Sequence, residues 1–132
     1  MSKKHEESFK KYLDKGGLPC IDIKIKGNNY VFLIDSGSDI SYIDTNIAED
    51  LCLPIIEGMF TNVTTIGAEH NEATVYNADI ELSDSTIHAE VTGIEVRATT
   101  KCLLVPFDGI IGIDILRSIG AELSFTENKL IY

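Results

Sequence analysis

One segment organises this chain: Val31-Phe32-Leu33-Ile34-Asp35-Ser36-Gly37-Ser38. Its four large apolar residues indicate a buried strand that runs directly into a carboxylate, a hydroxyl and a glycine. A carboxylate buried at the end of such a strand is costly unless it is paired, hydrogen-bonded or shifted in pKa, and proteins keep that arrangement mainly where the carboxylate does chemistry. Gly37 allows a sharp turn, and the hydroxyls of Ser36 and Ser38 can orient Asp35.

The same segment also fits an ordinary strand that ends in an Asx- or Ser-type turn, which Asp-Ser-Gly satisfies equally well. On local sequence alone the two interpretations are evenly balanced. A second segment, residues 105–116, favours the chemical one. In it Ile110 and Ile111 are closed by Gly112, and a short helix follows with Asp114 expected as its N-cap.

Asp35-Ser36-Gly37-Ser38 followed by Ile110-Ile111-Gly112 resembles the retropepsin-like aspartic proteases, which include retroviral proteases and their bacterial and cellular relatives. The resemblance extends from about Pro19 to Phe125. Residues 41–54 are similar to the segment after the active-site loop in cellular and bacterial members, and residues 116–125 to the retroviral C-terminal helix and interface strand. The resemblance implies an all-β fold: a closed retropepsin-like (acid protease) barrel with a flap hairpin, a short helix after the active-site loop and one short C-terminal helix.

The alternation of apolar and polar residues independently predicts short strands. Residues 21–26 alternate, and the turn signal Gly27-Asn28-Asn29 makes them a hairpin with the Asp35 strand. Residues 76–82 and 87–92 alternate in the same way around a turn at Ser83-Asp84-Ser85. The continuous apolar run Cys102-Leu103-Leu104-Val105 predicts a central strand. Short strands with regular turns favour a small all-β barrel.

The length of 132 residues fits one domain with a real core. We expect a polar, helix-compatible arm at residues 1–18 and the retropepsin-like domain at residues 19–132. The arm fits a polar leader, a dimer-stabilising extension or a partly disordered tail. Apart from this arm, only two short segments look helical, at about residues 45–51 and 115–119; they correspond to the two helices that the resemblance implies.

The count of catalytic motifs predicts the assembly. An aspartic protease needs two facing carboxylates, but the chain contains one Asp-Ser-Gly and no internal repeat, and Asp108-Gly109-Ile110 lacks the hydroxyl residue. The resemblance therefore implies a symmetric homodimer with the two Asp35 residues on the twofold axis. The pair would share one proton and activate a water for attack on a peptide carbonyl, with no metal and no organic cofactor.

The resemblance also assigns roles to single residues. Asp35 is the catalytic acid and base, Ser36 would bond across the dimer axis, and the Gly37 carbonyl would contact the substrate backbone. Ser36, Gly37 and Ser38 support the active-site loop, while Ile110, Ile111, Gly112 and Asp114 are structural residues beside it. Asp39 stands where retroviral enzymes grip the substrate main chain. The Arg that braces that Asp in those enzymes is replaced here by Ile113, which leaves a surface role for Asp39 open.

Residues 62–75 place two Thr- and Val-rich arms around a glycine, which predicts a β-hairpin. By resemblance this hairpin is the flap that closes over an extended peptide, with Ile66, Gly67 and Ala68 as substrate contacts at its tip. An ordinary exposed hairpin is the alternative. The sequence departs from retroviral flaps here, because Glu69, His70 and Asn71 replace a glycine-rich tip.

Composition narrows the classes of partner. A formal net charge of −10 argues against nucleic acid. No apolar stretch is long enough to span a bilayer and no signal-peptide core is present, so no membrane role is expected. Three widely spaced cysteines fit reduced, buried thiols in a cytoplasmic protein better than a disulfide framework, and no Cys or His residues have zinc-ligand spacing.

Two functions are therefore carried forward. The first is an aspartic endopeptidase that hydrolyses peptide bonds as a homodimer. The second is a non-catalytic retropepsin-like module for dimerisation or peptide binding. The intact Asp35-Ser36-Gly37 favours the first, while the altered flap tip and Ile113 keep the second open.

Residues 123–132 predict a strand, a turn and a strand, which would pair back onto the same chain or cross into a partner.

Overall fold

The computed structural model of the protein describes residues 5–63 and 71–132, and within them the side chains of all residues except 58–63 and 71–72. Its elements in chain order are β1 (Glu6–Ser8), α1 (Lys10–Asp14), β2 (Cys20–Ile25), β3 (Asn28–Ile34), β4 (Tyr42–Asp44), α2 (Thr45–Asp50), β5 (Ile55–Val63), β6 (Asn71–Leu82), β7 (Ser85–Ile94), α3 (Val96–Thr100), β8 (Gly109–Ile111), α4 (Ile113–Ser118), β9 (Glu122–Ser124) and β10 (Lys129–Ile131).

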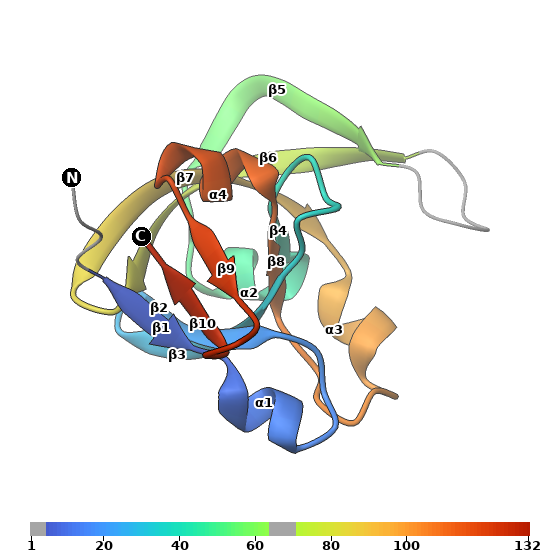
Figure 1. Ribbon diagram of the computed structural model, residues 1–132. Helices are drawn as coiled ribbons and strands as arrows, with labels where there is room; N and C mark the ends of the chain where they lie inside the picture. Colours follow the sequence, from blue (N-terminus) through green and yellow to red (C-terminus); the bar gives the residue numbers. More distant parts are fainter. Residues whose placement is uncertain (1–4, 64–70) are drawn as a thin grey trace.

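The main sheet of the described chain closes into a barrel. Its strand order is β2-β3-β8-β4-β7-β6-β5, and a further pairing between Lys24 of β2 and Glu81 of β6 joins the first strand to the sixth. β3 and β8 run parallel, as do β4 and β7, whereas the other neighbours are antiparallel. β5 lies outside the closure and, among the described strands, pairs with β6 alone (Figure 1). The closed all-β barrel with short helices is thus confirmed.

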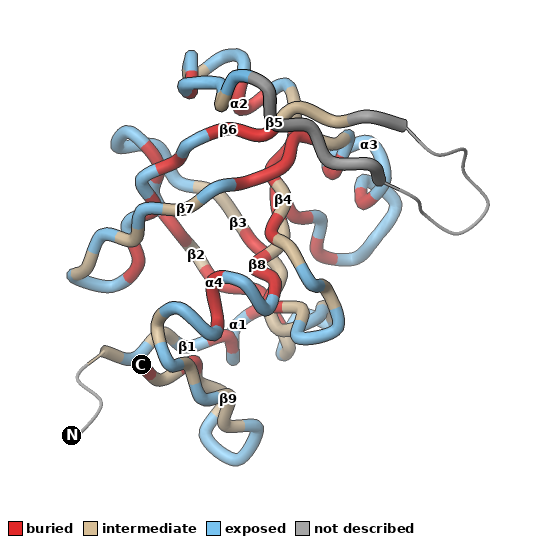
Figure 2. The backbone as a smooth tube through the Cα atoms, turned by 90° about the horizontal axis from the view of Figure 1, so that it is seen from above, coloured by how far each residue is buried: buried red, intermediate tan, exposed pale blue. Residues whose placement is uncertain are grey.

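The barrel is filled by the apolar residues that alternate along its strands. Ile21, Ile23 and Ile25 of β2 are at most 1% exposed, and Phe32 of β3 is fully buried. Successive side chains of a strand point to opposite faces, so this alternation places one apolar face inside the closed sheet. Buried stretches accordingly lie along the barrel strands, while the connecting turns are exposed (Figure 2).

The turn that precedes the Asp35 strand lies one residue earlier than predicted. Lys26 and Gly27 both have positive φ, of 51° and 80°, which is the backbone of a two-residue hairpin turn. Asn28 and Asn29 already belong to β3, where they pair with Ile25 and Lys24. The tight turn fixes the register between β2 and β3, and so the face on which each β3 side chain lies.

The prediction of a central strand at residues 102–105 is wrong. These residues form the turn between α3 and β8, and Leu103 and Leu104 are 43% and 81% exposed. The Leu103 N–H donates to the Thr100 carbonyl at 2.9 Å, and Pro106 has no N–H to donate to a neighbouring strand. The strand prediction failed because a short apolar run looks the same in the sequence whether it forms a buried strand or a turn.

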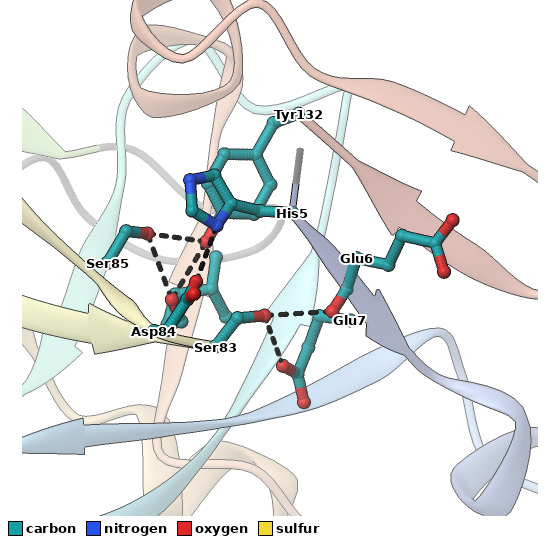
Figure 3. A network of polar contacts seen from close by, with 8 residues as sticks. His5, Glu6, Glu7, Ser83, Asp84, Ser85 and Tyr132 are labelled. Atoms are coloured by element: carbon teal, nitrogen blue, oxygen red, sulfur yellow. Dashed lines mark hydrogen bonds and ion pairs between the residues drawn. The ribbon is translucent and has the colours of Figure 1, made fainter. Parts of the chain in front are cut away.

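The N-terminal arm and the C-terminus form a second, three-stranded sheet with the order β1-β10-β9. Phe9, between β1 and α1, is fully buried. Tyr132 anchors the C-terminus, because its hydroxyl donates to the Leu82 carbonyl at 2.8 Å and lies 2.7 Å from Ser85 Oγ (Figure 3). The ring of His5 stacks on Tyr132 with the centroids 4.9 Å apart. The C-terminal strand therefore pairs back onto its own chain.

Candidate active site

Asp35 is the first residue after β3, and neighbours on both sides hold its backbone. The Ile34 N–H donates to the Pro19 carbonyl and the Asp35 N–H to the Ile111 carbonyl, both at 2.9 Å. These bonds continue the pairing of β3 with β2 on one side and with β8 on the other. The Asp35 backbone is thus fixed by the barrel, although the residue itself lies in a loop.

The Asp35 carboxylate is half-buried and bonded within its own loop. Asp35 Oδ1 accepts the N–H of Gly37 at 2.9 Å, and the Asp35 carbonyl accepts the N–H of Ser38 at 3.1 Å. A Cβ at position 37 would lie 3.2 Å from Asp35 Oδ1, so a larger side chain would crowd the carboxylate. Gly37 therefore lets the backbone approach and orient the carboxylate while leaving it accessible.

The loop after Asp35 rests on Gly112. Ser38 donates its hydroxyl to the Ile40 carbonyl, and the Ile113 N–H donates to the Ser38 carbonyl, each at 2.7 Å. A Cβ at Gly112 would lie 2.3 Å from the Ile40 oxygen and 2.9 Å from the Ser38 oxygen. Only glycine permits this backbone-to-backbone approach, which explains why the Ile-Ile-Gly motif accompanies the Asp-Ser-Gly motif.

Ser41 is the residue that sequence reasoning missed. It is fully buried, its N–H and hydroxyl donate to Asp114 at 3.1 and 2.6 Å, and its hydroxyl accepts the N–H of Gly112 at 2.8 Å. The expectation that Asp114 caps α4 is wrong, because Gly112 is the N-cap residue and Asp114 lies in the first turn. Its carboxylate instead accepts bonds from Ser41 and from the Ile115 N–H. A serine between two apolar residues, Ile40 and Tyr42, was the available signal.

Ser36 and Asp39 are exposed in the single chain, and Ile113, where the retroviral brace would stand, is 39% exposed. Asp39 lies near enough to Tyr42 to act on it: burial, with the charges of Asp39 and Asp114, raises the pKa of the Tyr42 hydroxyl. Ile110 and Ile111 occupy β8, where Ile110 is opposite Leu33 on one side and Tyr42 on the other. The structure thus brings both motifs together at one end of β3.

Two further carboxylates, those of Asp108 and Asp44, bond backbone groups of neighbouring strands and helices. Asp108 accepts the Val31 N–H and the Arg97 Nε–H, both at 2.8 Å, and the bond to Asp108 raises the pKa of Arg97. Asp44, which is 2% exposed, accepts the N–H groups of Asn46 and Arg97 at 3.1 and 3.0 Å. Asp108 is therefore committed to structural bonds, in agreement with its lack of the Asp-Ser-Gly pattern.

The β5–β6 hairpin extends past the barrel (Figure 1). Its stem pairs from Phe60 with Thr74 to Val63 with Asn71, and an irregularity separates this register from the pair Ile55 and Tyr76. The predicted tip contacts Ile66, Gly67 and Ala68 lie outside the described residues. The described hairpin stem agrees with the predicted hairpin at residues 62–75.

Residues 5–63 and 71–132 contain no cluster of three or more His, Cys, Asp or Glu side chains placed to hold a metal ion. Likewise, no helix among these residues has the length and apolar character needed to cross a membrane.

Comparisons with known proteins find one matching family and several similar folds. A family model described as aspartyl protease matches residues 21–115. The retroviral protease-like domain of Ddi1 from Leishmania major is 18% identical, with 84% of each chain covered and a TM-score of 0.58. The EIAV protease complexed with the inhibitor HBY-793 is 23% identical over 82% of this chain and 93% of its own, with a TM-score of 0.54. The simian foamy virus (mac) protease is 17% identical over 76% and 94%, also at 0.54. None of the curated protein sequences matches the chain.

Proposed function

This chain belongs to the aspartyl protease family, with a retropepsin-like fold, and on that premise we propose that it is an endopeptidase that works as a homodimer. The observation that carries the proposal is the Asp35 carboxylate. It is half-exposed at the end of a barrel strand, oriented by the Gly37 N–H, and held by a loop that Gly112 and Ser41 anchor. A binding module has no need for a carboxylate so placed.

The second carboxylate of the site would come from a second copy. The chain carries one Asp-Ser-Gly, and the carboxylate of Asp114, beside the loop, is already bonded to Ser41. Two identical chains related by a twofold axis would bring Asp35 of each to the same point. The catalytic unit would therefore be the dimer.

The chemistry follows from the repulsion between two carboxylates at such close range. They cannot both ionise without a large cost, so the pair holds one proton and titrates as a unit. The ionised Asp35 takes a proton from a bound water as that water attacks the peptide carbonyl carbon. The protonated Asp35 donates a hydrogen bond to the carbonyl oxygen, and its proton reaches the leaving amine when the C–N bond breaks.

The substrate would be an extended peptide held between the Asp35 loops and the β5–β6 hairpin, acting as a flap. The Gly37 carbonyl and the hairpin backbone would bond the peptide main chain as an added strand does. Closure would exclude bulk water from the reacting carbonyl. The surplus of acidic residues argues against nucleic acid as a ligand, and the three free thiols support a reducing compartment such as the cytoplasm.

The proposal is tested by cleavage of an unstructured protein such as casein from about pH 4 to pH 7, with and without pepstatin. The parent should cleave, pepstatin should inhibit it, and Asp35→Asn should remain folded and lose activity. Asp50→Asn is the matched control, because it makes the same charge change at an exposed residue that ends α2. A folded dimer that cleaves nothing, or an Asp35→Asn variant as active as the parent, would contradict the proposal. The first result favours the peptide-binding or dimerisation module.

A further inference from the structure

Two loops that are far apart in the sequence lie against each other: the loop after α1 and the loop after α3 (Figure 1). A Cβ at Gly16 would lie 3.0 Å from Leu104 Cδ1, and a Cβ at Gly17 would lie 2.6 Å from Val105 Cγ2. Glycine at both positions therefore lets the two loops come into contact.

Three leucines of these loops are exposed to solvent. Leu18, Leu103 and Leu104 are 50%, 43% and 81% exposed, and they account for half of the six large apolar side chains that are exposed in the described part of the chain. Single exposed leucines are common on protein surfaces, whereas several in one place with polar residues around them mark an interaction site.

The same part of this strongly acidic chain carries positive charge. Residues 10–18 hold three lysines against one aspartate, and residues 95–106 hold an arginine and a lysine against one glutamate, although the whole chain has a formal net charge of −10. Lys15 Nζ lies 5.7 Å from the centroid of the Tyr12 ring, which packs in the same apolar cluster as Val105. The other cations of the two segments except Lys101 are paired with aspartates.

Lys15 and Lys101 are exposed, and neither forms an ion pair with a described carboxylate. Each lies beside the leucines of its own loop, since Lys15 is three residues before Leu18 and Lys101 is two residues before Leu103. Their charges are therefore available to an acidic partner.

The leucine–lysine surface is made up of Lys15, Leu18, Lys101, Leu103 and Leu104. We propose that this surface binds an acidic segment of the protein substrate, in which aliphatic side chains are flanked by aspartate or glutamate. The aliphatic side chains would cover the three leucines, and the carboxylates would pair with the two lysines. The inference rests on the proposed function, because the occupant is the polypeptide to be cleaved.

The leucine–lysine surface adjoins the face of the barrel that carries Asp35. Leu18 directly precedes Pro19, whose carbonyl accepts the N–H of the residue before Asp35 at 2.9 Å. Val105 belongs to the apolar cluster against which Leu33 packs, and Leu33, two residues before Asp35, projects from the same face of the strand. A segment bound at this surface would therefore keep the rest of its chain at a high local concentration beside the Asp35 loop.

Charge favours this occupant over two others. A membrane of anionic lipids presents negative charge over a wide plane, so the acidic remainder of the chain would be repelled by it. A second copy of the chain that used the same surface would bring identical lysines together. A short acidic segment contacts only the local positive charge, and the more distant negative charges of the chain are screened by salt.

The test is the dissociation constant of a short fluorescent peptide, a run of leucines with glutamates on both sides, measured by anisotropy. The Asp35→Asn chain is used, so that the peptide stays intact. Adding Lys101→Glu or Leu104→Asp to it should raise the constant about tenfold, and added salt should raise it too. Lys24→Glu in β2 and Ile55→Asp in β5 make the same changes at exposed residues elsewhere, and they should leave the constant unchanged.

A second peptide with lysines in place of the glutamates should bind at least about tenfold more weakly. Equal binding of the two peptides, or peptide binding that Lys101→Glu and Leu104→Asp leave unchanged, would overturn the inference. Leu104→Asp is also tested for self-association and for binding to phosphatidylserine vesicles. If it weakens either of these and not peptide binding, the surface belongs to a second copy or to a membrane, and the inference is overturned as well.

Cleavage is measured separately, so that the inference and the proposed activity can fail independently. For a substrate that contains the glutamate-flanked leucines, the loss of kcat/KM in Lys101→Glu should come from a higher KM. Surface-dependent peptide binding by Asp35→Asn, with no cleavage by the parent, would support the surface and remove the proposed activity. Casein cleavage that requires Asp35, with peptide binding independent of the surface, would keep the activity and remove the surface.

Discussion

Ser41 donates its hydroxyl to Asp114 Oδ1 at 2.6 Å, and the same hydroxyl oxygen accepts the N–H of Gly112 at 2.8 Å. One fully buried side chain thus ties the end of the Asp35 loop to the start of α4. Because the Asp35 loop also rests on the Gly112 backbone, the position of the carboxylate depends on contacts more than seventy residues away in the sequence.

Ser41→Ala should destabilise the protein by about 1–3 kcal/mol, because it leaves the Gly112 N–H and one Asp114 oxygen without their buried partner. Activity should fall as well, since the loop that orients Asp35 loses its anchor. Urea unfolding measures the first effect and casein cleavage the second. Thr126→Ala is the control for stability, because Thr126 is exposed and far from the Asp35 loop in the sequence, and it should change the free energy of unfolding by less than about 0.5 kcal/mol. Equal losses for the two variants would count against the anchoring role of Ser41.

Gly112→Ala should be more damaging than an ordinary glycine substitution. The added Cβ would meet backbone, the Ile40 oxygen at 2.3 Å, and backbone yields less easily than a side chain. Gly27→Ala is the matched control: it has open space around the Cβ but a φ of 80°, so it suffers only conformational strain of about 1 kcal/mol. In thermal unfolding, the midpoint temperature of Gly112→Ala should be well below that of Gly27→Ala. The opposite order would show that the Ile40 contact relaxes without cost.

Tyr132→Phe should weaken the terminal sheet. It removes the hydroxyl that donates to the Leu82 carbonyl and lies beside Ser85 Oγ, and a bond of this kind contributes about 1 kcal/mol. Tyr30→Phe, at a half-buried residue of β3, is the control and should have a smaller effect. Amide exchange of residues 129–131 is the more specific readout and should accelerate only in Tyr132→Phe. Unchanged exchange would mean that the hydroxyl does not hold β10.

The three thiols should differ sharply in reactivity. The expectation of buried thiols is wrong for Cys52 and Cys102, which are exposed. Cys20 is fully buried, and burial raises the pKa of its thiol to about 11. A thiol reagent near neutral pH should modify two thiols of the native protein, and the third only after unfolding, because the thiolate is the reactive form. Rapid reaction of Cys20 in the folded protein would contradict its burial.

The same thiol makes a pH-dependent contribution to stability. The folded state keeps the Cys20 proton from about pH 9, where the unfolded chain releases it, to about pH 11. The contribution is complete below that window and is lost as the pH rises through it. The parent should therefore lose stability over this range more steeply than Cys20→Ala in urea unfolding under reducing conditions. If the free energy of unfolding fell with pH equally steeply in the two proteins, Cys20 would make no pH-dependent contribution to stability.

Much of the barrel could be predicted from the sequence, because alternation reports directly which face of a strand is buried. The β6–β7 hairpin and the Asp35 strand were expected on this ground, and both are confirmed. The strand expected at residues 102–105 was wrong because an apolar run does not show whether its side chains reach the core, and Leu104 is 81% exposed. A continuous apolar run, unlike an alternating one, does not show which of its side chains are buried.

The candidate site was predictable only in part. Asp35, Gly37 and Gly112 could be identified from their local motifs, because a tight turn and a close approach between two backbone segments both require glycine. The partnership of Ser41 with Asp114 joins residues far apart in sequence, and nothing near Ser41 identifies its acceptor. The sequence also suggested Asp114 as the N-cap of α4, because it does not show that the Asp114 carboxylate accepts the Ser41 hydroxyl instead.

A mixing experiment tests whether one active site is built from Asp35 of two chains. A fixed amount of parent is equilibrated with about a ninefold excess of Asp35→Asn, and cleavage is compared with the same mixture made with an inert protein. If each site needs both carboxylates, parent homodimers fall to about one tenth and activity falls with them. Activity that stays at the level of the inert mixture would show that a single chain holds the complete site, and would rule out a site shared between two chains.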